Sequence, residues 1–180
     1  MKSLWLTYFL LLSTFVNAQN ITALKQVSGS DSISNGTCII YGSFIQRLGF
    51  TSGGYPQDIR IENTETKEVF SFRVKPTFKS AKENTFCFSI KPGTYTILNY
   101  WFTQSKWYGG KMFTEPVINN ENRPYTFTVN KPLNYLGTWH FKTKNVSFSA
   151  DKTVLDAKLK SDYNHINFET ADTVLPVVLK

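Results

Sequence analysis

The chain contains 180 residues, of which 41% are hydrophobic, 16% aromatic and 18% charged, and its formal net charge at pH 7 is +7. This hydrophobic content excludes an intrinsically disordered chain, and the length suits a single domain with its own core. Because the 20 Lys and Arg residues are spread along the sequence, the charge indicates a basic surface without selecting nucleic acid as the partner.

An export signal occupies the N-terminus. Lys2 precedes an apolar run over residues 4–16, and Ala18 supplies a small residue at a cleavage position. We expect residues 1–18 to be removed, so that the mature protein begins at Gln19 and is secreted or located in the periplasm or cell envelope. A retained anchor is the alternative, but the run is shorter than the roughly 20 residues that span a bilayer.

The sequence after the signal predicts a free protein. No cysteine follows the cleavage site to accept a lipid, and no second apolar stretch reaches spanning length. We therefore expect no transmembrane segment after signal cleavage.

Short strands are expected after residue 37. Residues 19–37 are rich in Ser, Thr, Gly and Asn and read as a flexible N-terminal segment, whereas residues 38–180 read as one β-sandwich domain. Alternating apolar and polar residues predict strands at 38–44, 58–62, 69–74, 85–90, 95–102, 125–129, 133–141 and 145–148. Gly137, inside one of these runs, indicates a bulge.

The clearest turn signal joins two of these strands. Phe86, Phe88 and Ile90 alternate with polar residues before the sequence Lys-Pro-Gly-Thr at 91–94, and a second apolar run follows. Proline presets the first central φ of a type II turn and glycine accepts the positive φ after it. The segment therefore predicts a β-hairpin.

One helix is expected near the C-terminus. Asp151 is placed to cap a helix over residues 152–160, with Leu155 and Leu159 against a sheet edge and Val154 flanking them. Together these elements predict a mainly β fold, an antiparallel β-sandwich with one short C-terminal helix, with a small barrel as the alternative architecture.

The run Phe-Cys-Phe-Ser-Ile-Lys-Pro-Gly-Thr-Tyr-Thr-Ile at residues 86–97 resembles a hairpin of prealbumin-like and carboxypeptidase-regulatory-like β-sandwich modules. The sequence Tyr-Leu-Gly at 135–137 and the C-terminal Asp-containing helix with its Leu-Pro ending are similar to bacterial secreted proteins of unknown function that contain this hairpin. The resemblance implies a fold and a non-catalytic module, and it assigns no binding residues.

Cys38 and Cys87 both remain after signal removal. An even pair of cysteines in an exported protein invites a disulfide. However, Cys87 lies between Phe86 and Phe88, so it points away from the face that those rings occupy. The sequence leaves the disulfide open.

Candidate catalytic groups are few. The two histidines are His140, within a predicted strand, and His165, within a predicted turn. No nucleophile-elbow, zinc-protease, paired-cysteine or phosphate-loop motif is present, so no cofactor or metal is expected. A hydrolase using His140 or His165 with acidic partners remains the alternative to a non-enzymatic protein.

The aromatic residues at 100–108 are the best candidates for ligand binding. They place aromatic side chains on both faces of a strand end and in a Gly-ended loop: Tyr100, Trp101, Trp107 and Tyr108. Exposed Trp and Tyr beside Gln, Asn and Lys suit stacking on sugar rings or contact with a protein. The alternative is an edge strand covered by the N-terminal segment or by the C-terminal helix.

The sequence therefore leads to three functional hypotheses. The first is an exported, non-enzymatic binding module of the cell envelope, with an envelope protein or a glycan as its partner. The second is the secreted hydrolase, and the third is a structural or assembly protein.

Overall fold

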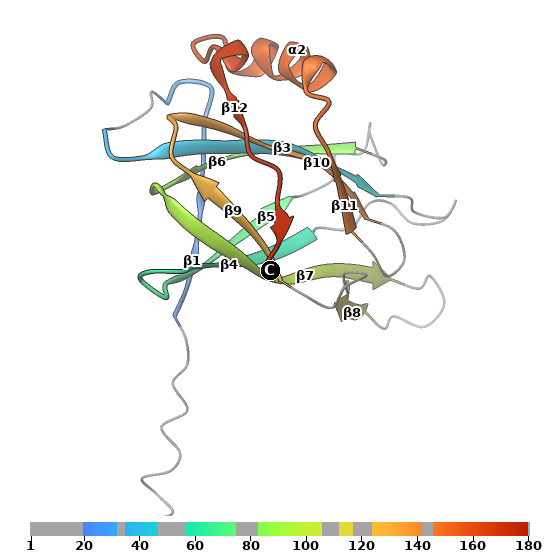
Figure 1. The fold of residues 1–180 in the computed structure, drawn as a ribbon. Coiled ribbons are helices and arrows are strands. Elements are labelled where there is room, and N and C mark those ends of the chain that lie inside the picture. Colours follow the sequence, from blue (N-terminus) through green and yellow to red (C-terminus); the bar gives the residue numbers. More distant parts are fainter. Residues whose placement is uncertain are drawn as a thin grey trace, which may run out of the picture.

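The protein forms a two-sheet sandwich with one helix on its outside (Figure 1). The structure is a computed structural model, and it describes residues 20–31, 35–46, 57–74, 83–105, 112–116, 124–141 and 146–179.

The first sheet, named sheet 1, contains seven strands. Its order is β1 (Ile21–Ala23), β5 (Val69–Val74), β4 (Gln57–Asn63), β7 (Gly93–Ser105), β9 (Tyr125–Val129) and β13 (Val177–Val178), and β8 (Met112–Pro116) pairs with the far part of β7. Strands β4, β7 and β9 pair antiparallel, as the alternating patterns indicate.

The second sheet, named sheet 2, contains six strands. Its order is β11 (Val146–Ser149), β10 (Leu133–Phe141), β3 (Cys38–Gln46), β6 (Glu83–Ile90) and β2 (Lys25–Gln26), and β12 (Asp172–Thr173) pairs with β10. The mainly β fold with one short helix is confirmed. The purely antiparallel sandwich is wrong, because β3 runs parallel to β10, β12 parallel to β10 and β1 parallel to β5.

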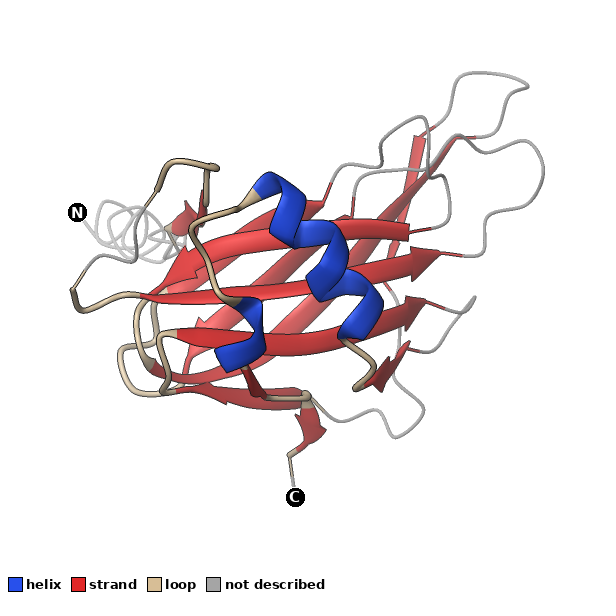
Figure 2. Ribbon diagram, turned by 90° about the horizontal axis from the view of Figure 1, so that it is seen from above, coloured by secondary structure: helices blue, strands red, loops and turns tan. Residues whose placement is uncertain are grey.

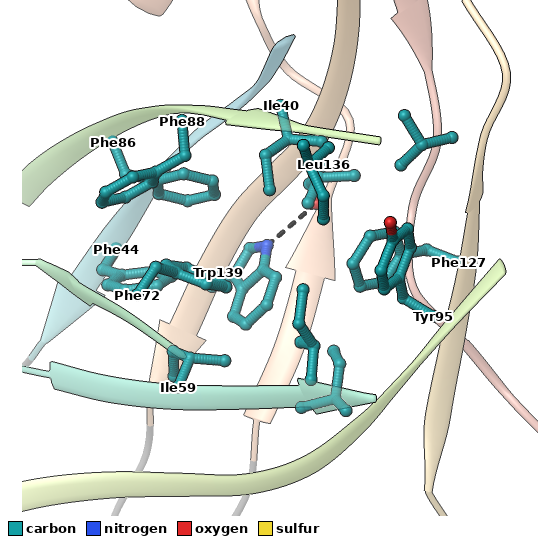
Figure 3. Close-up of a cluster of buried hydrophobic side chains, with 14 of the residues drawn as sticks. Ile40, Phe44, Ile59, Phe72, Phe86, Phe88, Tyr95, Phe127, Leu136 and Trp139 are labelled. Atoms are coloured by element: carbon teal, nitrogen blue, oxygen red, sulfur yellow. Dashed lines mark hydrogen bonds between the residues drawn. The ribbon is translucent and has the colours of Figure 1, made fainter. Parts of the chain in front are cut away.

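The main core lies between the two sheets and is built from aromatic rings (Figure 3). Phe44 lies 5.0 Å from Phe86 and 5.1 Å from Trp139 within sheet 2, and 6.5 Å from Phe72 of sheet 1, centroid to centroid. The Trp139 indole donates to the Leu136 carbonyl at 2.9 Å, so its one polar group is satisfied in the core. These rings occur at alternate positions in their strands, which places them on the inner face.

A second core lies between sheet 2 and α2 (Thr153–Asp162). Figure 2 shows the helix lying across the strands of this sheet. Leu155 and Leu159 are buried as expected, although they lie against the face of the sheet rather than its edge. Two details of the expected helix are wrong: Lys152, not Asp151, is the N-cap residue and makes no side-chain cap, and Val154 is 73% exposed.

The expected hairpin at 85–102 is wrong. β6 belongs to sheet 2 and β7 to sheet 1, so the link through Lys91 and Pro92 carries the chain from one sheet to the other. The same alternation serves both geometries, because Ile90 and Tyr95 face the core between the sheets in this arrangement too. The Tyr95 hydroxyl donates to the Lys91 carbonyl at 2.7 Å and fixes the link.

The bulge expected at Gly137 is confirmed. The β3–β10 register shifts between Tyr135 and Thr138, and Gly137 has φ +90°. A Cβ at Gly137 would lie 2.6 Å from a methyl carbon of Leu175 and 3.0 Å from the Ser149 carbonyl oxygen, so glycine fits both the conformation and the space.

The N-terminal segment expected to be flexible is ordered in part. Residues 21–23 pair with β5 and residues 25–26 pair with β6, so this stretch is a correction to the expectation for 19–37. A loose composition does not prevent pairing here, because Leu24 and Val27 supply buried side chains between polar residues. Among the described residues, α2 is the longest helix, and no helix has the length and apolar character needed to cross a membrane.

Candidate binding end of the sandwich

The four aromatic candidates lie at or beyond the far half of β7. Tyr100 pairs with Ile59 of β4, and Trp101 lies between Asp58 of β4 and Pro116 of β8. At this point β7 is an internal strand rather than the edge strand considered from the sequence. Trp107 and Tyr108 lie outside the described residues, in the connection from β7 to β8.

This far half of β7 belongs to one end of the sandwich. In sheet 2 the paired residues at this end are Ile45 with Glu83, and Phe141 with both Gln46 and Val146. In sheet 1 they are Gln57 with both Val74 and Phe102, and Ser105 with Met112. The opposite end is closed by short links through residues 91–92 and 130–132, which hold the two sheets together there. The strand ends of both sheets therefore meet at the same end.

Four connections leave and re-enter the sheets at this end: 47–56, 75–82, 106–111 and 142–145. In sequence they contain eight Lys and Arg residues and no Asp or Glu, whereas the rest of the chain holds 12 basic and 13 acidic residues. They also contain five aromatic residues: Phe50, Tyr55, Phe78, Trp107 and Tyr108. We name this end of the sandwich, from which the four connections depart, the basic end.

Sequence reasoning missed this concentration of charge. The basic residues looked scattered because the connections are separated by strands along the chain. Their strand ends meet only once the strand directions of both sheets are known, so no local pattern could have revealed the basic end.

Two surface hollows lie elsewhere, beside the short 3₁₀ helix η1 (Phe168–Thr170). One, of about 550 Å³, has Leu133 and Ile166 in its lining, with Lys131 and His165 at its polar positions. The other, of about 460 Å³, lies against α2 and contains the Lys152–Asp156 ion pair. Their polar groups take part in interactions that hold the helix and η1 in place: Lys152 donates to the Phe168 carbonyl at 3.0 Å, and Asn167 accepts from the Glu169 amide at 3.2 Å.

The two histidines are not brought together. His140 Nε2 lies 2.8 Å from Ser149 Oγ across the β10–β11 pair, and His165 Nε2 contacts the backbone carbonyl of Asp31. Among the interactions of the described residues, neither ring contacts a carboxylate. The His140–Ser149 contact has the distance of a base and a nucleophile, but the third group that would orient the imidazole is not among these contacts.

The two cysteines are free and buried, so the disulfide considered from the sequence does not form. Cys38 pairs in register with Ile90, and Cys87 pairs with Tyr41. Cys38 lies in the core between the sheets, whereas Cys87 lies beneath α2, on the opposite face of sheet 2. Burial raises the pKa of the Cys87 thiol to about 12, which leaves it protonated and unreactive at neutral pH.

A polar network fixes α2 on sheet 2. The Tyr41 hydroxyl donates to Asp156 at 2.8 Å, and Asp156 also pairs with Lys152 at 3.2 Å. Next to it, the Tyr135 hydroxyl donates to the Asp151 carbonyl at 2.7 Å. Burial, together with the bond to Asp156, raises the pKa of Tyr41 well above its ordinary value. These groups hold the fold and are not poised for proton transfer.

Comparison with known proteins yields no family. No protein-family model and no curated protein matches the chain. A leucine-rich repeat protein from Bacteroides thetaiotaomicron is a structural match at 15% identity, with a TM-score of 0.36. The match covers 70% of this chain and 16% of that chain. A likeness this weak supports neither a shared fold nor a shared role.

Proposed function

We propose that this protein is an exported, non-enzymatic binding module whose basic end holds an anionic glycan of the cell envelope. The observation that carries the proposal is the segregation of charge: the four connections at this end contain eight basic residues and no acidic one. A region of one sign raises the local concentration of an oppositely charged partner and speeds its encounter.

The aromatic residues favour a glycan over a protein as that partner. Trp107 and Tyr108 stand between Lys106 and Lys111 in the connection from β7 to β8. Aromatic faces stack on the apolar faces of sugar rings, while Lys side chains pair with carboxylate or sulfate groups. The export signal places the protein where envelope glycans occur and nucleic acid is not the ordinary partner.

The non-enzymatic part of the proposal rests on the histidines. His165 contacts a backbone carbonyl, and His140 contacts a serine without a carboxylate among its described contacts. Neither arrangement has the nucleophile, base and orienting group that a hydrolase combines.

Binding of the mature protein to polygalacturonate, with neutral dextran as the reference, tests the proposal. We expect binding to polygalacturonate alone, weakening as salt rises because surface charges are screened within about 8 Å at physiological ionic strength. Trp107→Ala should weaken binding at least tenfold and leave the circular dichroism spectrum unchanged. Lys158→Ala, on the exposed side of α2, is the matched control and should bind like the wild type.

Two outcomes contradict the proposal. Equal binding to dextran would remove the role of charge, and full binding by Trp107→Ala would remove the role of the aromatic residues. If no polysaccharide binds, but an envelope protein is retained by the wild type and lost with Trp107→Ala, the partner is a protein and the glycan is wrong.

A further inference from the structure

The N-terminal strap, residues 20–31, crosses all three layers of the protein. It starts at the open edge of sheet 1, where Ile21 pairs with Val69 of β5. The Leu24 amide then donates to the Ser71 carbonyl at 2.8 Å, and the Leu24 side chain packs against the core between the sheets. The strap is thus anchored to sheet 1 within its first five residues.

The strap next fixes sheet 2 to the end of α2. The Val27 amide donates to the Cys87 carbonyl at 3.0 Å, and the Val27 side chain is buried beneath the helix. The Tyr163 hydroxyl, just after α2, donates to the Val27 carbonyl at 3.2 Å. Gly29 passes so close that a Cβ there would lie 2.8 Å from the Asp162 carbonyl oxygen. The strap therefore holds the C-terminal end of the helix.

The strap also directly follows the expected cleavage site. Only three residues separate Ala18 from Ile21, a span of about 10 Å of extended chain. A domain of this size has a radius of gyration of about 15 Å. A docked strap would hold the folded sandwich against the bilayer and the peptidase, which needs extended, accessible chain on both sides of the bond it cuts.

We propose that the strap docks only after the export signal is removed, and that its docking is the maturation step that fixes the end of α2. The inference rests on the export signal of the proposed function. Residues 38–179 form the sandwich first, with β5 and β6 keeping open edges, and the freed strap then pairs with both of them.

Hydrogen exchange read by mass spectrometry tests this with two full-length forms in the same detergent. One is the mature chain from Gln19, and the other is the uncleaved chain with Ala18→Trp, which places a bulky residue where cleavage requires a small one. We expect the amides of Leu24 and Val27 to exchange at least tenfold faster in the uncleaved form, together with those around Tyr163. Amides of β3 and β10 should be equally protected in both forms.

A matched pair of variants in the mature chain separates docking from general stability. Val27→Asp should release the strap and reproduce the exchange of the uncleaved form, whereas Ser30→Ala, exposed on the same strap, should not. Equal strap protection in the two forms overturns the inference, as does loss of β3 and β10 protection in the uncleaved form. N-terminal sequencing of the exported wild type distinguishes the two proposals, because a retained Met1 refutes export, whereas cleavage with equal protection refutes only the strap.

Discussion

Replacing Tyr41 by Phe tests how strongly α2 is held on sheet 2. The change removes the 2.8 Å bond from Tyr41 to Asp156 and keeps the ring contacts with Tyr135 and Phe168, whose centroids lie 5.2 and 4.9 Å away. A hydrogen bond to a charged group contributes about 1.5–3 kcal/mol. Because Asp156 keeps its partner Lys152, we expect a loss near the lower limit, about 2 kcal/mol. For a domain of this size that lowers the Tm by about 4–8 °C.

Tyr95→Phe is the matched control. Tyr95 is as fully buried as Tyr41, but its hydroxyl donates to a neutral acceptor, the Lys91 carbonyl. We expect this variant to lose about 1 kcal/mol. Urea unfolding at pH 7, with unchanged m-values, measures both losses. If Tyr41→Phe costs no more than Tyr95→Phe, the bond to Asp156 does not hold the helix and the reasoning fails.

Alkaline pH gives an independent measure of the same site. Burial and the bond to Asp156 raise the pKa of Tyr41 above its ordinary value near 10. Above pH 10 the unfolded state therefore ionises first, and the contribution of Tyr41 to stability is lost as pH rises towards the folded-state pKa. The slope is about 1.4 kcal/mol per pH unit. The stability difference between wild type and Tyr41→Phe should shrink above pH 10, and a constant difference would contradict the assigned cause.

Three further predictions follow from the described packing. Gly137→Ala should cost about 1–3 kcal/mol more than Gly36→Ala, because both glycines have positive φ but only Gly137 has Leu175 and a carbonyl against it; unfolding by urea measures the difference. Cys87→Ala should flatten the loss of stability between pH 9 and 12, since the thiol with its pKa raised to about 12 destabilises the fold by about 1.4 kcal/mol per unit as pH rises. A serine-directed fluorophosphonate should leave Ser149 unlabelled, and labelling found by mass spectrometry would support the hydrolase.

Local alternation was sufficient to predict where several strands begin and end. The expected strands at 69–74, 125–129 and 133–141 coincide with β5, β9 and β10. Each has buried side chains at alternate positions, and that period belongs to the strand itself. The helix was also visible from Leu155 and Leu159, but Lys152 serves Asp156 and the Phe168 carbonyl instead of leaving the cap position to Asp151.

Strand pairing could not be predicted from the same patterns. The link at 91–92 shows why: a proline and a glycine turn the chain whether the next strand joins the same sheet or the opposite one. Buried alternation is satisfied in both cases, since each places Ile90 and Tyr95 against the core. The choice depends on β3 and β4, which occupy the positions beside β6 and β7. Such partners are distant in sequence and carry no local signal.

The same dependence on strand direction explains the candidate site. β3, β5, β7 and β10 all run towards the basic end, so the connections that follow them depart from one place although up to 95 residues separate them in sequence. The positive charge is therefore polarised by topology and not by composition. Since the attraction of a polyanion is summed over four connections, removing one Lys should change affinity little, whereas Trp107 contributes contact area that no charge replaces. A graded loss with successive Lys→Gln changes, beside a sharp loss with Trp107→Ala, would identify the two contributions; a sharp loss with a single Lys would instead indicate one specific ion pair.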